Sequence, residues 1–170
     1  METLEAIFTR RSIRQFTDER VSEEMVEKLL RAAMNAPSAN NRQSWHFIVV
    51  NEREKLNKIA EIHQYGKMCA HAPLAFICCH DETLEDVRSY GIQNVSAAIQ
   101  NMLLATRDIG LGGVWLGVYP RDERVKEFQV IFHMPDHILP VGVVFVGHTD
   151  KEQTYVDRYQ PSRVHYNSWE

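Results

Sequence analysis

The sequence lacks the features of a membrane-spanning or secreted protein. No stretch of its 170 residues approaches the roughly eighteen consecutive apolar residues of a membrane span. Residues 1–10 contain no long apolar core, so they do not form a signal peptide. Cysteine is scarce, and Cys69, Cys78 and Cys79 show no CxxC spacing. This usage favours buried thiols in a reducing compartment over a disulfide or a metal site, and we expect a cytoplasmic protein.

An excess of positive charge and the common catalytic motifs are also missing. The chain has 19 basic and 23 acidic residues and a net charge of -4, which argues against non-specific nucleic-acid binding. GxSxG, GxxxxGK[ST] and HExxH do not occur, and Gly110, Gly112 and Gly113 do not form GxGxxG. A Rossmann dinucleotide site is therefore not supported.

The histidines show no metal-ligand pattern. His133 and His137 are four residues apart, but Pro135 breaks any helix that would place them on one face. A surface loop is the better interpretation there. His46 lies in an apolar run, where a hydrogen-bonded structural role is expected rather than a ligand role.

The composition is that of an ordinary globular domain. Apolar residues make up 44% of the chain and charged residues 25%. A chain of this length is expected to form one domain over residues 1–170 and to bury roughly 70% of its unfolded surface.

Apolar periodicity predicts alternating helices and strands. Because the strands are apolar at almost every position, both faces of the sheet should be covered by helices. The tail, residues 151–170, is polar and aromatic and should wrap onto another subunit. The predicted helices span 2–9, 22–34, 54–63, 87–109 and 122–132, and the predicted strands span 45–50, 72–79, 114–118 and 140–147.

A basic run follows the first predicted helix. Arg10, Arg11 and Arg14 surround Ser12 and carry charges that repel one another unless an anion lies among them. Guanidinium groups present planar donors suited to phosphate or carboxylate. The run is therefore either an anion site or a solvated basic turn.

Three further segments combine with this run. They are the polar loop 37–43, the glycine-rich start of the third strand and Arg163 in the tail. Together they supply phosphate binders, amide and hydroxyl donors and a backbone open to close approach. A large planar ligand with one phosphate would use all of them.

Four motifs resemble the nitroreductase family, in the family's order along the chain. They are RRSIRQF at 10–16, APSANNRQSW at 36–45, GLGGVWLG at 110–117 and SRVHY at 162–166. The resemblance covers nearly the whole chain and implies an α+β fold, a three-layer α-β-α sandwich. Its mixed central sheet would have four core strands plus an exchanged C-terminal extension, about residues 150–170. It also implies a homodimer with FMN at the interface.

The resemblance implies a role for each matching residue. Arg10, Arg11, Ser12 and Arg163 would hold the phosphate and ribityl chain of FMN, and Arg14 would approach the pyrimidine side of the flavin ring. Leu116 and Gly117 would lie against the ring, and Gln64 would face the pyrimidine. The ring would be covered from the other subunit by Pro37, Ser38, Ala39 and Asn41.

The implied activity is NAD(P)H-driven reduction of small acceptors such as nitroaromatics or quinones by a ping-pong mechanism. The flavin carries the chemistry, so no side chain is assigned a catalytic role. The sequence departs from the family in two places. Ser44 replaces the usual proline after the loop, so a less rigid loop is expected, and the short segment after the third strand leaves little room for a substrate lid, which leaves the acceptor open. Two alternatives remain open. One is a specialised flavin reaction, dehalogenation or flavin fragmentation, and the other is a non-catalytic dimer that binds flavin or nucleotide.

Overall fold

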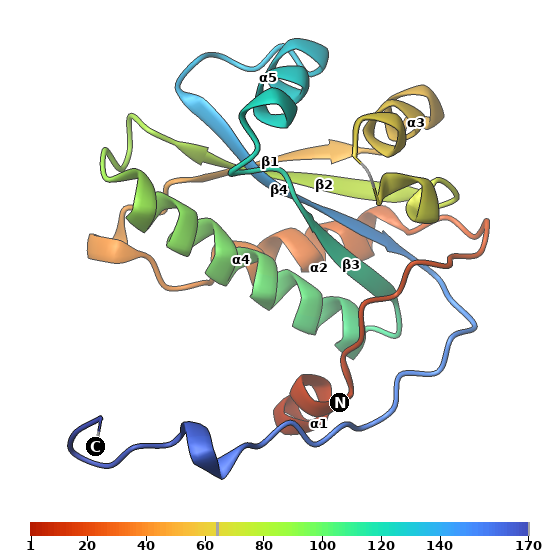
Figure 1. Ribbon diagram of the computed structural model, residues 1–170. Coiled ribbons are helices and arrows are strands. Elements are labelled where there is room, and N and C mark those ends of the chain that lie inside the picture. Colours follow the sequence, from red (N-terminus) through yellow and green to blue (C-terminus); the bar gives the residue numbers. More distant parts are fainter. Residues whose placement is uncertain (64, 170) are drawn as a thin grey trace.

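The computed structural model (Figure 1) describes residues 1–63 and 65–169. The predicted helices and strands are confirmed, with ends that differ by a few residues. In chain order the elements are α1 (Thr3–Thr9), α2 (Glu23–Met34), η1 (Ala39–Asn41), β1 (Trp45–Val50), α3 (Arg53–Ile62), η2 (Gly66–Cys69), β2 (Leu74–Asp81), α4 (Arg88–Asp108), β3 (Gly112–Gly117), α5 (Asp122–Ile131), β4 (Ile138–Gly147) and η3 (Pro161–Arg163).

The four strands form one sheet in the order β1-β2-β4-β3. All three strand pairs are antiparallel, so the expectation of a mixed sheet of core strands was wrong. A continuous apolar strand sequence indicates that both faces of the sheet are covered, but it does not indicate whether neighbouring strands run parallel or antiparallel. Within residues 1–63 and 65–169, a parallel contact occurs at the isolated bridge of Ser12 with Gly113, where the Ile13 N–H donates to the Gly113 carbonyl oxygen at 2.9 Å.

Helices cover both faces of the sheet and confirm the three-layer α+β architecture (Figure 1). On one face α3 and α5 bury Leu56, Ile59 and Phe128 against the strands. On the other face α2 and α4 bury Leu29 and Ile99. Each helix removes an apolar stripe from water, which is the main force that holds the layers together.

Helix α4 is the long central helix of its layer. Its buried positions include Val95, Ala98 and Met102, and Asn94 is also almost fully buried. The ring of His80 lies so close to Gly91 that any side chain at position 91 would collide with it. The few charges in the middle of this helix are thus explained by burial against the sheet and α2.

The tail after β4 runs over the surface. It passes α1, where the rings of Phe8 and Tyr155 meet edge to face at 5.4 Å, and it ends away from the sheet (Figure 1). Tyr159, Tyr166 and Trp169 stay largely exposed. Among the described residues, none of the helices combines the length and the apolar character needed to cross a bilayer.

Candidate active site

An open cleft of about 450 Å³ lies at the C-terminal end of edge strand β3. Three residues predicted to contact a flavin, Arg14, Leu116 and Gly117, line it together. They come from segments about a hundred positions apart in the chain. The bridge of Ser12 with Gly113 explains their meeting, because it lays the basic run alongside the strand. The other described lining residues are His63, Tyr65, Trp115 and Arg124.

Two side chains converge on the carbonyl oxygen of Gly117. His63 Nε2 lies 2.9 Å from this oxygen, and an Arg124 guanidinium nitrogen donates to it at 2.8 Å. The Tyr65 N–H donates to His63 Nδ1 at 3.2 Å, so the proton of the neutral imidazole sits on Nε2. The end of the strand is therefore fixed from outside the sheet by one neutral donor and one charged donor.

His63 is kept neutral by its surroundings. Its side chain is buried, and this burial lowers the pKa of His63 below its usual value. The hydrogen bond to Gly117 acts in the opposite direction, and the charge of Arg124 lowers the pKa again. The positive charge of the cleft therefore comes from Arg14 and Arg124.

The glycine at position 117 is not required by the packing of the chain itself. A Cβ atom built there would meet only the Tyr119 carbonyl oxygen, at 3.7 Å, which is ordinary contact. Gly142 on the neighbouring strand is different, because a Cβ there would collide with the indole of Trp115. Gly117 therefore leaves bare backbone facing an open cleft, the surface that a flat ligand needs for close approach.

Arg14 stands free of acidic partners in the described part of the chain. Its guanidinium donates to the Ser12 carbonyl oxygen at 3.3 Å, and it forms no ion pair with the described residues. Ser12 and Arg14 also line a neighbouring hollow of about 540 Å³. Arg14 lines both hollows, so a ligand that extended from one hollow into the other would pass the positive charge of Arg14.

Arg10 and Arg11 face a separate hollow of about 340 Å³ between α1 and the tail. Burial lowers the pKa of Arg10, and the charges of Arg11 and Arg158 lower it further. The Arg11 guanidinium donates to the carbonyl oxygens of Phe8 and Arg10 at 3.0 and 2.6 Å. Crowded cations of this kind are stabilised by an anion. Within one subunit, the tail residue whose charge lowers the pKa of Arg10 is Arg158.

The loop 37–43 has a strained backbone. Asn40, Asn41 and Gln43 have φ angles of 51°, 54° and 49°, in the left-handed region that non-glycine residues rarely adopt. The Gln43 N–H donates to Ser38 Oγ at 3.0 Å, and Gln43 Nε2 donates to Asn41 Oδ1 at 2.9 Å. Strain of this kind persists only where the surroundings hold it, and it concentrates at functional sites.

Asn94 of helix α4 holds this loop in place through two hydrogen bonds. Its Oδ1 accepts from the Ala39 N–H at 2.8 Å, and its Nδ2 donates to Ser44 Oγ at 3.2 Å. Ser44 is fully buried, and its carbonyl oxygen accepts from the Asp81 N–H at 2.8 Å. The hydroxyl of Ser44, at the position where the family usually has a proline, thus ties the loop to the helix.

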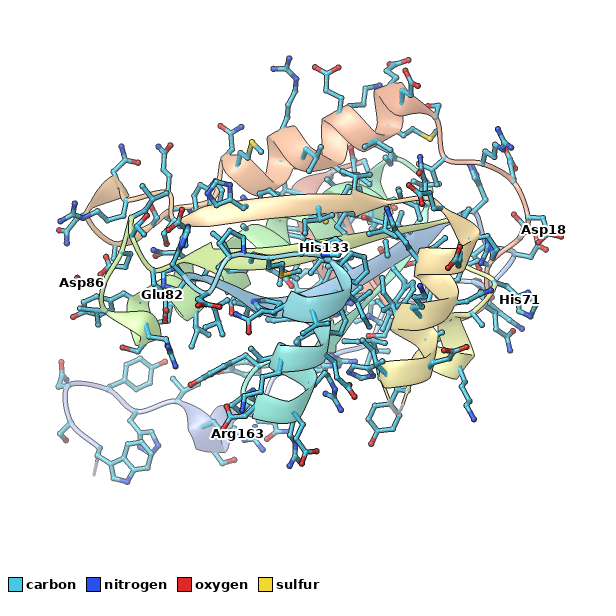
Figure 2. All side chains as sticks on the ribbon, turned by 90° about the horizontal axis from the view of Figure 1, so that it is seen from above. Asp18, His71, Glu82, Asp86, His133 and Arg163 are labelled. Carbon is cyan, nitrogen blue, oxygen red and sulfur yellow. The ribbon has the colours of Figure 1, made fainter. Side chains whose placement is uncertain are left out.

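The structure does not bring every predicted residue to the cleft. The cleft is not lined by four of them, which lie on the loop held by Asn94 of α4: Pro37, Ser38, Ala39 and Asn41. Arg163 sits on the exposed tail (Figure 2), and its side chain forms no hydrogen bond or ion pair with the described residues. Gln64 lies outside the described residues. A single subunit therefore carries only part of the expected flavin site.

Four cleft residues were missed by the sequence reasoning. His63 and Tyr65 follow the end of α3, Trp115 lies in β3, and Arg124 lies in the first turn of α5. The alternation in β3 offered one signal, since Trp115 points to the same side as Gly117. Nothing local marks His63 or Arg124, because their roles depend on helices packed beside the strand end.

The remaining histidine predictions can be compared with the structure. His46 Nε2 lies 3.1 Å from Asp81 Oδ2, which confirms its hydrogen-bonded role. Both His133 and His137 are exposed, in the turn between α5 and β4 (His133 is labelled in Figure 2). The three cysteines are free and buried, as predicted.

Comparison with known proteins places this geometry in a family. The model of the nitroreductase family matches residues 7–68 and 63–148. A protein from Methanothermobacter thermautotrophicus, provisionally named NADH dehydrogenase/NAD(P)H nitroreductase, is 46% identical over 99% of this chain and 88% of its own length. A crystal structure of a protein with the same provisional name from Parabacteroides distasonis is 36% identical, with a TM-score of 0.93 over 98% of each chain.

A third similar protein was solved with a ligand. It is a provisionally named nitroreductase from Desulfovibrio desulfuricans in complex with FMN. It is 28% identical and has a TM-score of 0.84 over 99% of this chain and 98% of its own. With the family model matched over most of its length, the chain belongs to the nitroreductase family of oxidoreductases.

Proposed function

We propose that the protein is an FMN-dependent oxidoreductase that uses NAD(P)H to reduce small planar acceptors, nitroaromatics or quinones, by a ping-pong mechanism. One observation carries the proposal: Arg14, Leu116 and Gly117 line one open cleft. The FMN complex of the relative from Desulfovibrio desulfuricans and the NAD(P)H in the relatives' names support it.

The residues of the cleft fit a flavin. Gly117 presents bare backbone without being required by internal packing, and Leu116 adds an apolar edge beside it. Arg14 brings a positive charge to the same cleft without an acidic partner in the described chain. An isoalloxazine ring needs just this combination of a flat surface and a donor for its pyrimidine oxygens.

Each residue has a binding task in this proposal. Arg10, Arg11, Ser12 and Arg163 would hold the phosphate and ribityl chain, and Arg14 would contact the pyrimidine. The fixed charge of Arg14 favours the more negative redox form of the cofactor and so raises its potential. The loop 37–43 of a second copy would cover the ring, and its strained conformation supports a preformed contact surface.

FMN held in this cleft by Arg14, Leu116 and Gly117 would supply the two-electron hydride chemistry that links NAD(P)H oxidation to acceptor reduction. For a nitro group the overall reaction is Ar–NO₂ + NAD(P)H + H⁺ → Ar–NO + NAD(P)⁺ + H₂O. The chain orients both partners in the same cleft, one after the other. His63, neutral and already hydrogen-bonded at both nitrogens, holds the strand end and gives no proton.

Two surfaces support a homodimer. Leu4, Ile7 and Phe8 of α1 are exposed, and the tail keeps its aromatic rings in water in the single chain. Burying such side chains against a second copy would be favourable. We propose that the tail, about residues 150–170, crosses to the partner and that the enzyme works in the cytoplasm, where its three free thiols stay reduced.

The decisive experiment is anaerobic reduction of the purified protein. A yellow flavin spectrum should bleach on addition of NADH or NADPH and return when a nitroaromatic or quinone is added. A colourless protein that takes up no FMN would refute the proposal. Bound flavin that neither nucleotide reduces would favour the non-catalytic alternative.

A further inference from the structure

The cleft contains one cation that the flavin does not account for. Arg124 lines it together with Arg14, but Arg14 is assigned to the pyrimidine edge. A guanidinium group has five N–H donors, and Arg124 uses one of them on the Gly117 carbonyl oxygen at 2.8 Å. The described residues take up none of the others.

Acids do not neutralise Arg124 in the described structure. Asp122 and Glu123 precede it in the first turn of α5, yet neither forms an ion pair with it. No described lining residue of the cleft is acidic, although the chain as a whole carries a charge of -4. A half-buried guanidinium with spare donors and no counter-charge favours an anionic ligand.

The position of Arg124 restricts where that anion lies. Its guanidinium touches the carbonyl of Gly117, the residue against which the flavin ring would lie. An anion bound there is beside the stacked ligand, within reach of a substituent on the reacting ring itself. The phosphates of a nicotinamide dinucleotide are separated from the reacting ring by a ribose.

Aromatic side chains complete the recognition surface. Tyr65 and Trp115 line the same cleft and remain 52% and 37% exposed. Exposed rings beside a guanidinium suit a flat aromatic ligand, which they can contact by stacking or edge contacts. His63 adds no charge, because its environment keeps it neutral.

We propose that Arg124 binds a carboxylate carried by a planar aromatic acceptor, so that the enzyme prefers anionic over neutral aromatic acceptors. The proposal rests on the function proposed above and names the acceptor class of that same cleft. Bidentate guanidinium–carboxylate pairing gives both the affinity and the orientation. Arg124 is a specificity residue that orients the acceptor and takes no part in electron transfer.

The test compares two acceptors of nearly equal shape, 4-nitrobenzoate and 4-nitrobenzamide, with saturating NADH and the FMN-loaded protein. We expect kcat/KM to favour the carboxylate by about tenfold, the size of one partly screened charge-assisted hydrogen bond. Arg124→Gln should bring the ratio of the two values to about one, and Arg124→Lys, which keeps the charge, should restore part of it. Arg121→Gln is the matched control, since it removes the same charge from the residue that precedes α5, outside the cleft.

The outcomes separate this inference from the proposed function. If neither acceptor is reduced, the proposed function fails and the inference fails with it. If both are reduced with equal kcat/KM, the function stands and the preference for anions is refuted. If Arg124→Gln raises the KM of NADH or NADPH and leaves the acceptor ratio intact, Arg124 binds the reductant and the inference is again wrong. Flavin absorbance per subunit verifies that each variant is loaded.

Discussion

Replacing Asn94 by alanine should loosen the loop 37–43 and destabilise the protein beyond the loss of a simple hydrogen bond. Asn94 is 3% exposed, and it links the Ala39 N–H at 2.8 Å to Ser44 Oγ at 3.2 Å. Alanine leaves both groups without that partner, and Ser44 is fully buried. Each stranded polar group costs about 1–3 kcal/mol, so the expected loss for the two groups is about 2–6 kcal/mol. This corresponds to a decrease in melting temperature of about 4–24 °C.

The matched control is Asn101→Ala on the same helix. Asn101 Nδ2 donates one hydrogen bond, to the Ala32 carbonyl oxygen at 3.2 Å, and its side chain is only half-buried. Its loss should cost about 1 kcal/mol. Both variants replace asparagine by alanine in helix α4. They differ in whether the lost side chain supports the strained loop.

The assay is urea denaturation of the flavin-free protein at one fixed protein concentration, followed by FMN titration of the folded variants. Asn94→Ala should lower the urea midpoint more than Asn101→Ala and should weaken FMN binding, because the strained loop loses its support. Equal midpoints for the two variants would refute the argument that Asn94 holds the loop. If Asn94→Ala lowers the urea midpoint but leaves the FMN affinity unchanged, the conformation of the loop does not contribute to flavin binding.

Three further predictions follow from single sites. Because burial lowers the pKa of His63, the unfolded chain binds more protons as the pH falls through about 6.5, and stability should decrease there. Urea midpoints between pH 7.5 and 5.5 should show a smaller decrease in His63→Gln. Gly117→Ala should change the free energy of unfolding by less than about 1 kcal/mol and should weaken FMN binding. Gly142→Ala places a methyl group against Trp115, so thermal unfolding should show a loss of about 1–3 kcal/mol. Burial raises the pKa of the Cys69 thiol to about 11 and that of Cys79 to about 12, and it also raises the pKa of Cys78. A thiol reagent at pH 8 should therefore label these three cysteines only after unfolding.

Local signals predicted the helices and strands because each depends on neighbouring residues. Ser22 was expected to begin the second helix, and its hydroxyl accepts from the Met25 N–H at 3.3 Å. The long helix was predicted to end at residue 109, and Gly110, which comes next, has a φ angle of 82°. The motif around Arg14 and the motif around Gly117 were each recognisable, and the structure brings them into one cleft.

Strand direction depended on contacts between distant segments. The apolar strands were compatible with parallel, mixed or antiparallel pairing, since burial on both faces gives the same sequence pattern. Only the packed sheet shows that β1, β2, β4 and β3 pair antiparallel throughout.

The sequence by itself determined the elements and the covered faces of the sheet, because propensity, capping and periodicity act over a few residues, and its four motifs identified the family. Tertiary structure decided which side chains meet. His63 and Arg124 converge on the carbonyl of Gly117, and Asn94 supports the loop through Ala39 and Ser44. Such contacts join residues far apart in the chain, and their geometry is set by the packing of whole helices on the sheet, which no local pattern encodes.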